Sequence, residues 1–186
     1  MGFRLSWVAV HDSAPDAVYA DLGFRRTGKF EEFPESPFCG AASKTGWTLV
    51  VMNRSSAALD GTVDLARLSK LGDVVACFVE EHVMCSAAAC WSSGKVTWSV
   101  VHESSKGMRD LQATGVLPAS FDAAVKVAEH ELAANGGDQS DVDYHFDVPV
   151  ELAKSIAGFR HDEDGEFDQG FEVLQSEEAK WKEQRR

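Results

Sequence analysis

Hydrophobic and polar residues alternate along several stretches of the chain with the two-residue period of a β-strand. Two such stretches lie at residues 3–10 and 47–52. Four more follow one another in the centre, at residues 73–83, 84–91, 95–103 and 109–114. Short turn sequences, such as residues 92–95, separate these central segments, and strands joined by short turns pair antiparallel. The centre of the chain therefore predicts an antiparallel sheet.

Other segments repeat their hydrophobic residues every three to four positions, as an α-helix does. We expect helices over residues 13–22, 63–71, 118–134 and 150–157, each followed by a glycine that favours a helix end. Residues 142–146 predict a short strand. The last part of the chain carries a sparse stripe at helical spacing, formed by Phe167, Phe171, Leu174 and Trp181. This stripe predicts a helical tail.

These elements predict an α+β fold. We expect a mostly antiparallel twisted sheet of about five or six strands, with two or three helices packed on one face. Residues 1–158 are expected to form a single domain, and residues 159–186 an acidic loop with a C-terminal amphipathic tail. The chain has 186 residues, of which 44% are hydrophobic, and this is enough to bury a core without disulfides.

Acidic residues are concentrated at the C-terminal end. The formal net charge is −12, and residues 136–186 account for −8 of it, with 14 acids and 6 bases. Such a surface repels phosphates, so we expect no direct binding to nucleic acid. It would attract a basic protein partner. The residues expected to contact this partner are Asp141, Asp143, Tyr144, Asp147, Glu151, Asp162, Glu163, Asp164 and Glu166.

The cysteines and the N-terminal residues indicate a cytoplasmic protein. Cys39, Cys77, Cys85 and Cys90 include no C-x-x-C pair, so reduced thiols are expected. No apolar run is long enough to span a membrane, and the first residues do not form a signal peptide. Residues 1–6 match the N-myristoylation pattern, but they equally begin the first strand, and whether Gly2 is lipidated stays open.

The acidic run from Phe159 to Phe167 fails as an EF-hand calcium loop. If Gly165 takes the position of the invariant glycine, Arg160 falls at the first ligand position and Phe171 at the last. Neither side chain binds calcium in the required way. We expect a solvated connection here, with no bound metal and no cofactor.

Three histidines lie near the ends of expected strands, with two acids close to them in the sequence. A cluster of His11, His82 and His102 with Glu80 or Glu103 would bind zinc or serve in acid–base catalysis. The alternative is that each histidine lies half-exposed at the rim of the sheet. Because no nucleophile-elbow, P-loop or dinucleotide-binding motif is present, the sequence leaves open whether the protein is an enzyme.

The leading expectation is a small acidic binding protein that recognises a basic protein partner. Immunity proteins, which act as antidotes to secreted toxins, share this compact and acidic character. One alternative is a metal-dependent or histidine-based hydrolase that uses the histidine cluster. The other is a structural subunit that forms a homo-oligomer.

Overall fold

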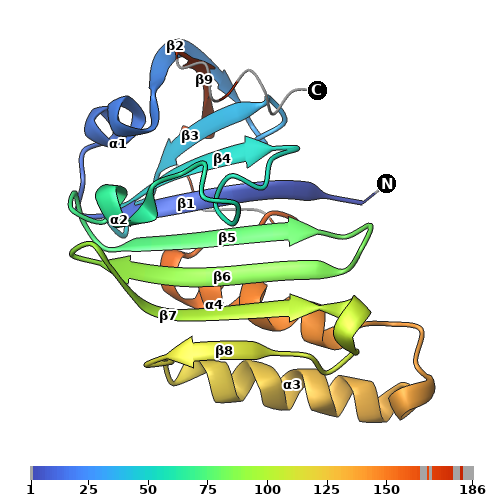
Figure 1. Cartoon of the computed structure of the whole chain (residues 1–186). Coiled ribbons are helices and arrows are strands. Elements are labelled where there is room, and N and C mark those ends of the chain that lie inside the picture. Colours follow the sequence, from blue (N-terminus) through green and yellow to red (C-terminus); the bar gives the residue numbers. More distant parts are fainter. Residues whose placement is uncertain (1, 164–166, 168, 178–180, 182–186) are drawn as a thin grey trace.

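The computed structural model describes residues 2–163, 167, 169–177 and 181. In this part of the chain nine strands form one antiparallel sheet, in the order β2-β9-β3-β4-β1-β5-β6-β7-β8 (Figure 1). The strands are β1 (Arg4–His11), β2 (Phe24–Glu31), β3 (Phe38–Ala42), β4 (Trp47–Asn53), β5 (Val74–Glu80), β6 (Cys85–Ser92), β7 (Lys95–Glu103), β8 (Gln112–Gly115) and β9 (Phe171–Ser176).

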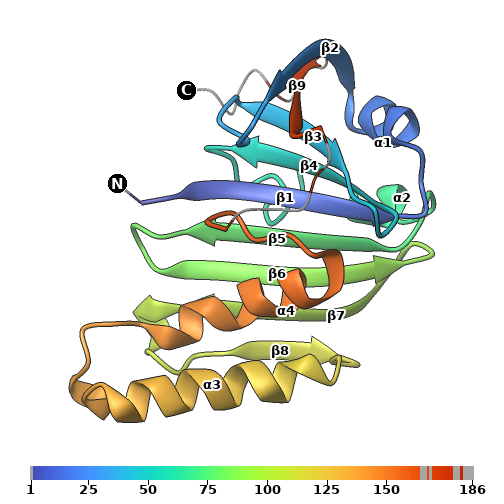
Figure 2. The same cartoon turned by 180° about the vertical axis from the view of Figure 1, so that it is seen from behind.

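Helices cover both faces of this sheet. They are α1 (Pro15–Leu22), α2 (Leu65–Leu68), α3 (Ser120–Ala134) and α4 (Asp147–Ala157). Figure 1 shows α1 and α2 in front of the sheet, and Figure 2 shows α3 and α4 on the opposite face. The fold is α+β, but the expected number of strands and the expected single helical face were both wrong. The expectation missed β2, β3 and β9, which lie together at one end of the sheet.

The central strand β1 separates two hydrophobic cores. Its odd-numbered residues, such as Trp7, pack into the core beneath α4, while even-numbered residues such as Val8 pack into the core beneath α1 and α2. Both faces of β1 are therefore buried. Alternation of side chains across a strand sends neighbouring residues to opposite cores.

The end of the chain returns to the sheet as a strand. β9 inserts between β2 and β3 and pairs antiparallel with both. The predicted helical stripe is wrong, because Phe171 packs into the core beneath α4 and Leu174 into the other core. Trp181 is fully buried, donates its Nε1–H to the Leu22 carbonyl at 2.8 Å and stacks on Phe24. It anchors the C-terminal segment onto the body of the protein.

The expected strand over residues 142–146 was also wrong. Residues Tyr144–Phe146 form a short 3₁₀ helix, η3, directly before α4. The Asp143 carboxylate accepts from the Phe146 N–H at 3.3 Å and so caps this turn. Local capping by an aspartate competes with extended backbone, which explains the difference.

The sequence predicted reduced thiols and no apolar segment long enough to span a membrane. All four cysteines are free thiols, and Cys39 and Cys77 are buried. Within the residues described, no helix is long and apolar enough to cross a membrane.

Candidate functional site

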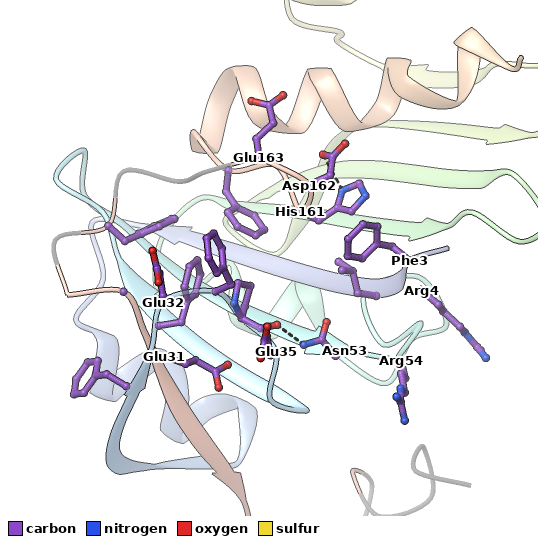
Figure 3. A pocket seen from close by; sticks show the side chains of 18 of the residues that line it. Phe3, Arg4, Glu31, Glu32, Glu35, Asn53, Arg54, His161, Asp162 and Glu163 are labelled. Atoms are coloured by element: carbon purple, nitrogen blue, oxygen red, sulfur yellow. Dashed lines mark hydrogen bonds and ion pairs between the residues drawn. The ribbon is translucent and has the colours of Figure 1, made fainter. Parts of the chain in front are cut away.

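An open groove of about 960 Å³ lies where four parts of the chain meet (Figure 3). They are the start of β1, the end of β2 with the connection to β3, the segment from Phe159 to Phe171, and the end of β4 with Arg54. The third part comes from the end of the chain, and β9 holds it against β2 and β3. The groove therefore exists only because the C-terminal segment joins the sheet.

Phenylalanine rings form both the floor and the rim of this groove. Phe159 is buried and contacts Phe167 and Phe171, each with a centroid separation of 6.0 Å. At the rim the rings are open to solvent: Phe3 is 44% exposed, and Phe30 and Phe33 are each 49% exposed. Half-exposed aromatic rings around one concavity are typical of a surface that binds another molecule.

Carboxylates dominate the charged lining. Among the residues that the structure describes, five acids and two arginines contribute, for a formal charge of −3, and they are Glu31, Glu32, Glu35, Asp162, Glu163, Arg4 and Arg54. Glu31 is committed to structure, because it accepts hydrogen bonds from the N–H and hydroxyl of Ser36 at 2.9 and 2.8 Å. Burial alone would raise the pKa of Glu31, but hydrogen bonds from Cys39 and Ser36 lower it overall.

Two acids of the groove remain available to a partner. Glu32 and Glu35 are exposed, and neither makes a side-chain hydrogen bond or ion pair with another part of the chain that the structure describes. In the sequence Glu32 lies between Phe30 and Phe33, and Glu35 follows Phe33 by two residues. The β2–β3 connection thus presents apolar surface and free negative charge together.

Arg160 pairs with acids of α4 and of the segment that follows it. The Arg160 side chain is only 13% exposed. Its guanidinium donates to Asp162 at 2.6 Å and to Asp147 at 2.8 Å, and it also pairs with Glu151. Burial would lower the pKa of Arg160, but these carboxylates raise it overall. Lys154 pairs with Glu163 at 2.8 Å. The four acids expected to face a partner are therefore partly neutralised within the protein.

His161 lies beside the groove with both ring nitrogens unsatisfied. Its side chain is 1% exposed, and neither nitrogen has a hydrogen-bond partner among the described residues. Nε2 lies 3.6 Å from Oε1 of Glu81, and Nδ1 lies 3.8 Å from Oδ1 of Asp162. Phe3 packs edge-on against the ring with a centroid separation of 5.0 Å, as Figure 3 shows. Burial lowers the pKa of His161, so the ring is neutral near pH 7.

A smaller cavity of about 460 Å³ shares His161 with the groove. Glu81, His82, Asp147 and Arg160 also line it. His161 thus lies at the boundary between two concavities.

The structure does not bring the three expected histidines together. Because β1 and β5 are antiparallel, Val10 pairs with Val74 whereas Arg4 pairs with Glu80. His11 and His82 therefore lie beyond opposite ends of the paired stretch, which from Val74 to Glu80 alone spans about 20 Å at roughly 3.3 Å per residue. No group of three or more potential ligands within the described ranges is arranged to hold a metal ion.

The other members of that set have separate partners. His102 is fully buried and bonds to the Asp110 carbonyl at 2.7 Å and to Asp143 at 2.9 Å. Glu80 pairs with Arg4 at 2.9 Å and with His82 at 3.0 Å. Glu103 pairs with Lys106 at 2.6 Å.

The residues expected to contact a partner differ in their exposure and in the pairs that they form within the protein. Asp141 is exposed and Tyr144 is partly buried. The Asp143 side chain is 7% exposed because it pairs with His102. Asp147, Glu151, Asp162 and Glu163 lie around Arg160 and Lys154. Asp164 and Glu166 lie outside the described residues.

Sequence reasoning missed the β2–β3 side of the groove. The signal lies in the run Phe30-Glu31-Glu32-Phe33-Pro34-Glu35, which places phenylalanines and glutamates together beside a proline. Phenylalanines in a charged, proline-containing connection indicate an exposed apolar surface, because a connection offers them no core.

Comparison of the chain with protein-family models, with curated protein sequences and with solved structures gave no match. The fold and the groove define an α+β protein built on one antiparallel sheet, with an aromatic and acidic concavity at the start of β1.

Proposed function

We propose that this is a binding protein that recognises a basic protein partner through the groove. The observation that carries the proposal is the combination of three half-exposed phenylalanines with free carboxylates in one concavity. A protein that neutralises a basic toxin, as an immunity protein does, is one member of this class.

The rings would supply most of the affinity. Full burial of an aromatic side chain contributes about 1.5–3 kcal/mol, and half of each ring at Phe3, Phe30 and Phe33 is already buried. Covering the exposed halves would therefore contribute several kcal/mol together, before the cost of association. Such clustered aromatic anchors are typical of the centre of an interface.

The acids would supply steering and selectivity. Glu32 and Glu35, which have no side-chain partner among the described residues, can pair with lysine or arginine side chains, and the described lining of the groove carries a formal charge of −3. Complementary charge raises association rates and disfavours acidic partners. The acids around Arg160 add a weaker field, because internal pairs offset part of their charge.

Affinity capture from the native host's lysate tests this proposal, using the wild-type protein and two groove variants. Phe33→Ala removes a rim ring and Glu32→Gln removes a free charge without changing shape. Val116→Ala is the matched control, because Val116 is 85% exposed but follows β8 at the other edge of the sheet.

The proposal requires one basic protein that the wild type and Val116→Ala retain, that moderate salt weakens and that Phe33→Ala loses. Retention that is indifferent to salt and to both groove variants would contradict it. A stable homo-oligomer with no heterologous partner would instead favour the structural-subunit alternative.

A further inference from the structure

We propose that Glu81 and His161 form a recognition site for a primary ammonium group, the Nζ of a lysine side chain on the partner. This inference rests on the proposed function, since it names one chemical group of the partner recognised beside the same groove. Glu81 lies in the turn between β5 and β6, and His161 follows α4 and Arg160.

The first argument is that a buried ring nitrogen and a carboxylate oxygen lie side by side without a hydrogen bond between them. Among the described residues Nε2 of His161 has no hydrogen-bond partner, and Oε1 of Glu81 lies 3.6 Å from it. A separation of 3.6 Å is too long for a hydrogen bond between the two groups. Buried polar atoms in native proteins are nearly always bonded, and each unsatisfied one costs about 1–3 kcal/mol. A bound ligand accounts for that cost.

The second argument is the distance itself. One donor nitrogen placed about 2.8–2.9 Å from both atoms fits two acceptors that are 3.6 Å apart. An ammonium carries three donors on one nitrogen and so bonds both acceptors at once. A planar guanidinium directs two parallel N–H bonds at acceptors placed as closely as the two oxygens of one carboxylate, so it suits a pair that is 3.6 Å apart less well.

The third argument is charge. A neutral imidazole offers one lone pair, and the Glu81 carboxylate supplies the negative charge that a cation needs. Arg160 also lines the smaller cavity, but Asp147, Asp162 and Glu151 surround its guanidinium. Its repulsion toward a second cation is therefore largely offset.

Two partly exposed side chains lie at the pair, and they are Phe3 and Glu81 itself. Phe3 packs edge-on against His161 and is 44% exposed, and the Glu81 side chain is 31% exposed. Rotation of the Phe3 ring toward the groove would open Nε2 to a lysine that enters from either cavity. Glu81 Oε2 accepts the Phe3 N–H at 2.8 Å, which keeps the start of β1 in place while Oε1 stays free.

Nuclear magnetic resonance on the full chain tests the site with a defined probe. The Cε1–Hε1 signal of His161, assigned by its loss in His161→Phe, is followed while Nα-acetyl-lysine methylamide is added. The control compound is Nα,Nε-diacetyl-lysine methylamide, which lacks the ammonium. Putrescine is added separately to distinguish a lysine side chain from a free polyamine.

We expect a saturable shift of the His161 signal with the lysine amide and none with the diacetylated compound. Glu81→Gln should weaken binding by about tenfold or more, because it removes the charge and keeps the acceptor for the Phe3 N–H. Asp122→Asn, which removes an exposed acid of α3 that lines neither cavity, should leave it unchanged. An unshifted signal, or equal affinity in Glu81→Gln, overturns the inference, and so does tighter binding of putrescine than of the lysine amide.

The failures of the two proposals are distinguishable. If the captured partner depends on Phe33 but binds Glu81→Gln as tightly as wild type, the ammonium site is refuted and the binding function stands. If the lysine amide binds but no partner depends on Phe33, the proposed function fails instead.

Discussion

His102 should be a buried imidazolium whose charge stabilises the fold, and Asp143→Asn tests this directly. The ring lies between two acceptors, the Asp110 carbonyl at Nδ1 and the Asp143 carboxylate at Nε2, at 2.7 and 2.9 Å. An imidazole satisfies two acceptors only when both nitrogens carry protons. Burial alone would lower the pKa of His102, but the bonds to Asp143 and Asp110 raise it overall.

The sign of the pH dependence follows from both partners. A histidine pKa raised by folding gives stability that is complete below the unfolded value of about 6.5 and is lost as the pH rises through the folded pKa. For Asp143 burial would raise the pKa, but the bond from His102 lowers it overall. That contribution is present above about pH 3.9 and is lost as the pH falls further. The pair therefore stabilises most between about pH 4 and 6.5.

The expected magnitude comes from one buried, charge-assisted hydrogen bond. Removing such a bond while keeping the side-chain shape costs about 1.5–3 kcal/mol. Asp143→Asn should cost this much at about pH 5.5. At about pH 8.5 the cost should be smaller, because the contribution of the charged ring is lost as the pH rises through the folded pKa of His102, and the new amide donates to a neutral Nε2.

Urea denaturation of wild type and Asp143→Asn at the two pH values measures the effect. Asp141→Asn is the control, since it makes the same charge change at an exposed position two residues earlier. An equal loss of stability at both pH values, or a loss no larger than that of Asp141→Asn, would refute the buried imidazolium.

Three further predictions concern other buried groups. Trp181→Ala should lower the free energy of unfolding by about 3–5 kcal/mol in denaturant titrations, because the ring is fully buried; a loss below about 1 kcal/mol would show that the C-terminal segment is not anchored there. Arg160→Met should cost about 1–3 kcal/mol near neutral pH, less than a fully buried pair because its acids are partly exposed, and the cost should shrink as the pH falls below about 4, where the carboxylates begin to take up protons. Cys77 should react with a thiol reagent only on unfolding, since burial raises its pKa to about 12; rapid labelling without urea would contradict this.

Local sequence pattern was sufficient for the centre of the sheet. The alternation over residues 73–103 and its short turns predicted antiparallel strands, and β5, β6 and β7 pair in that way. Gly23 was expected to end the first helix, and it does so with a positive φ of 78°. Both features depend only on neighbouring residues, so they can be predicted from the sequence alone.

β2 and β9 could not be predicted, because no local hydrophobic pattern in the sequence marks them as strands. β2 is an edge strand whose residues from Arg25 to Phe30 are exposed, so it shows no alternation of buried and exposed positions. β9 is buried on both faces, and the spacing of Phe171 and Leu174 imitates a helical period. Only its pairing with β2 and β3, more than 120 residues earlier in the chain, makes it a strand.

In the candidate site, too, some features follow from the sequence and others depend on the tertiary structure. By itself the sequence determined the acidic balance, the central strands and the residue types that are available for recognition. Tertiary structure alone decided which of them meet: it separated His11 from His82, buried Asp143 against His102 and placed the β2–β3 connection beside Phe159 and His161. The physical reason is that strand direction and long-range pairing set these distances, and neither is encoded by the residues next to each side chain.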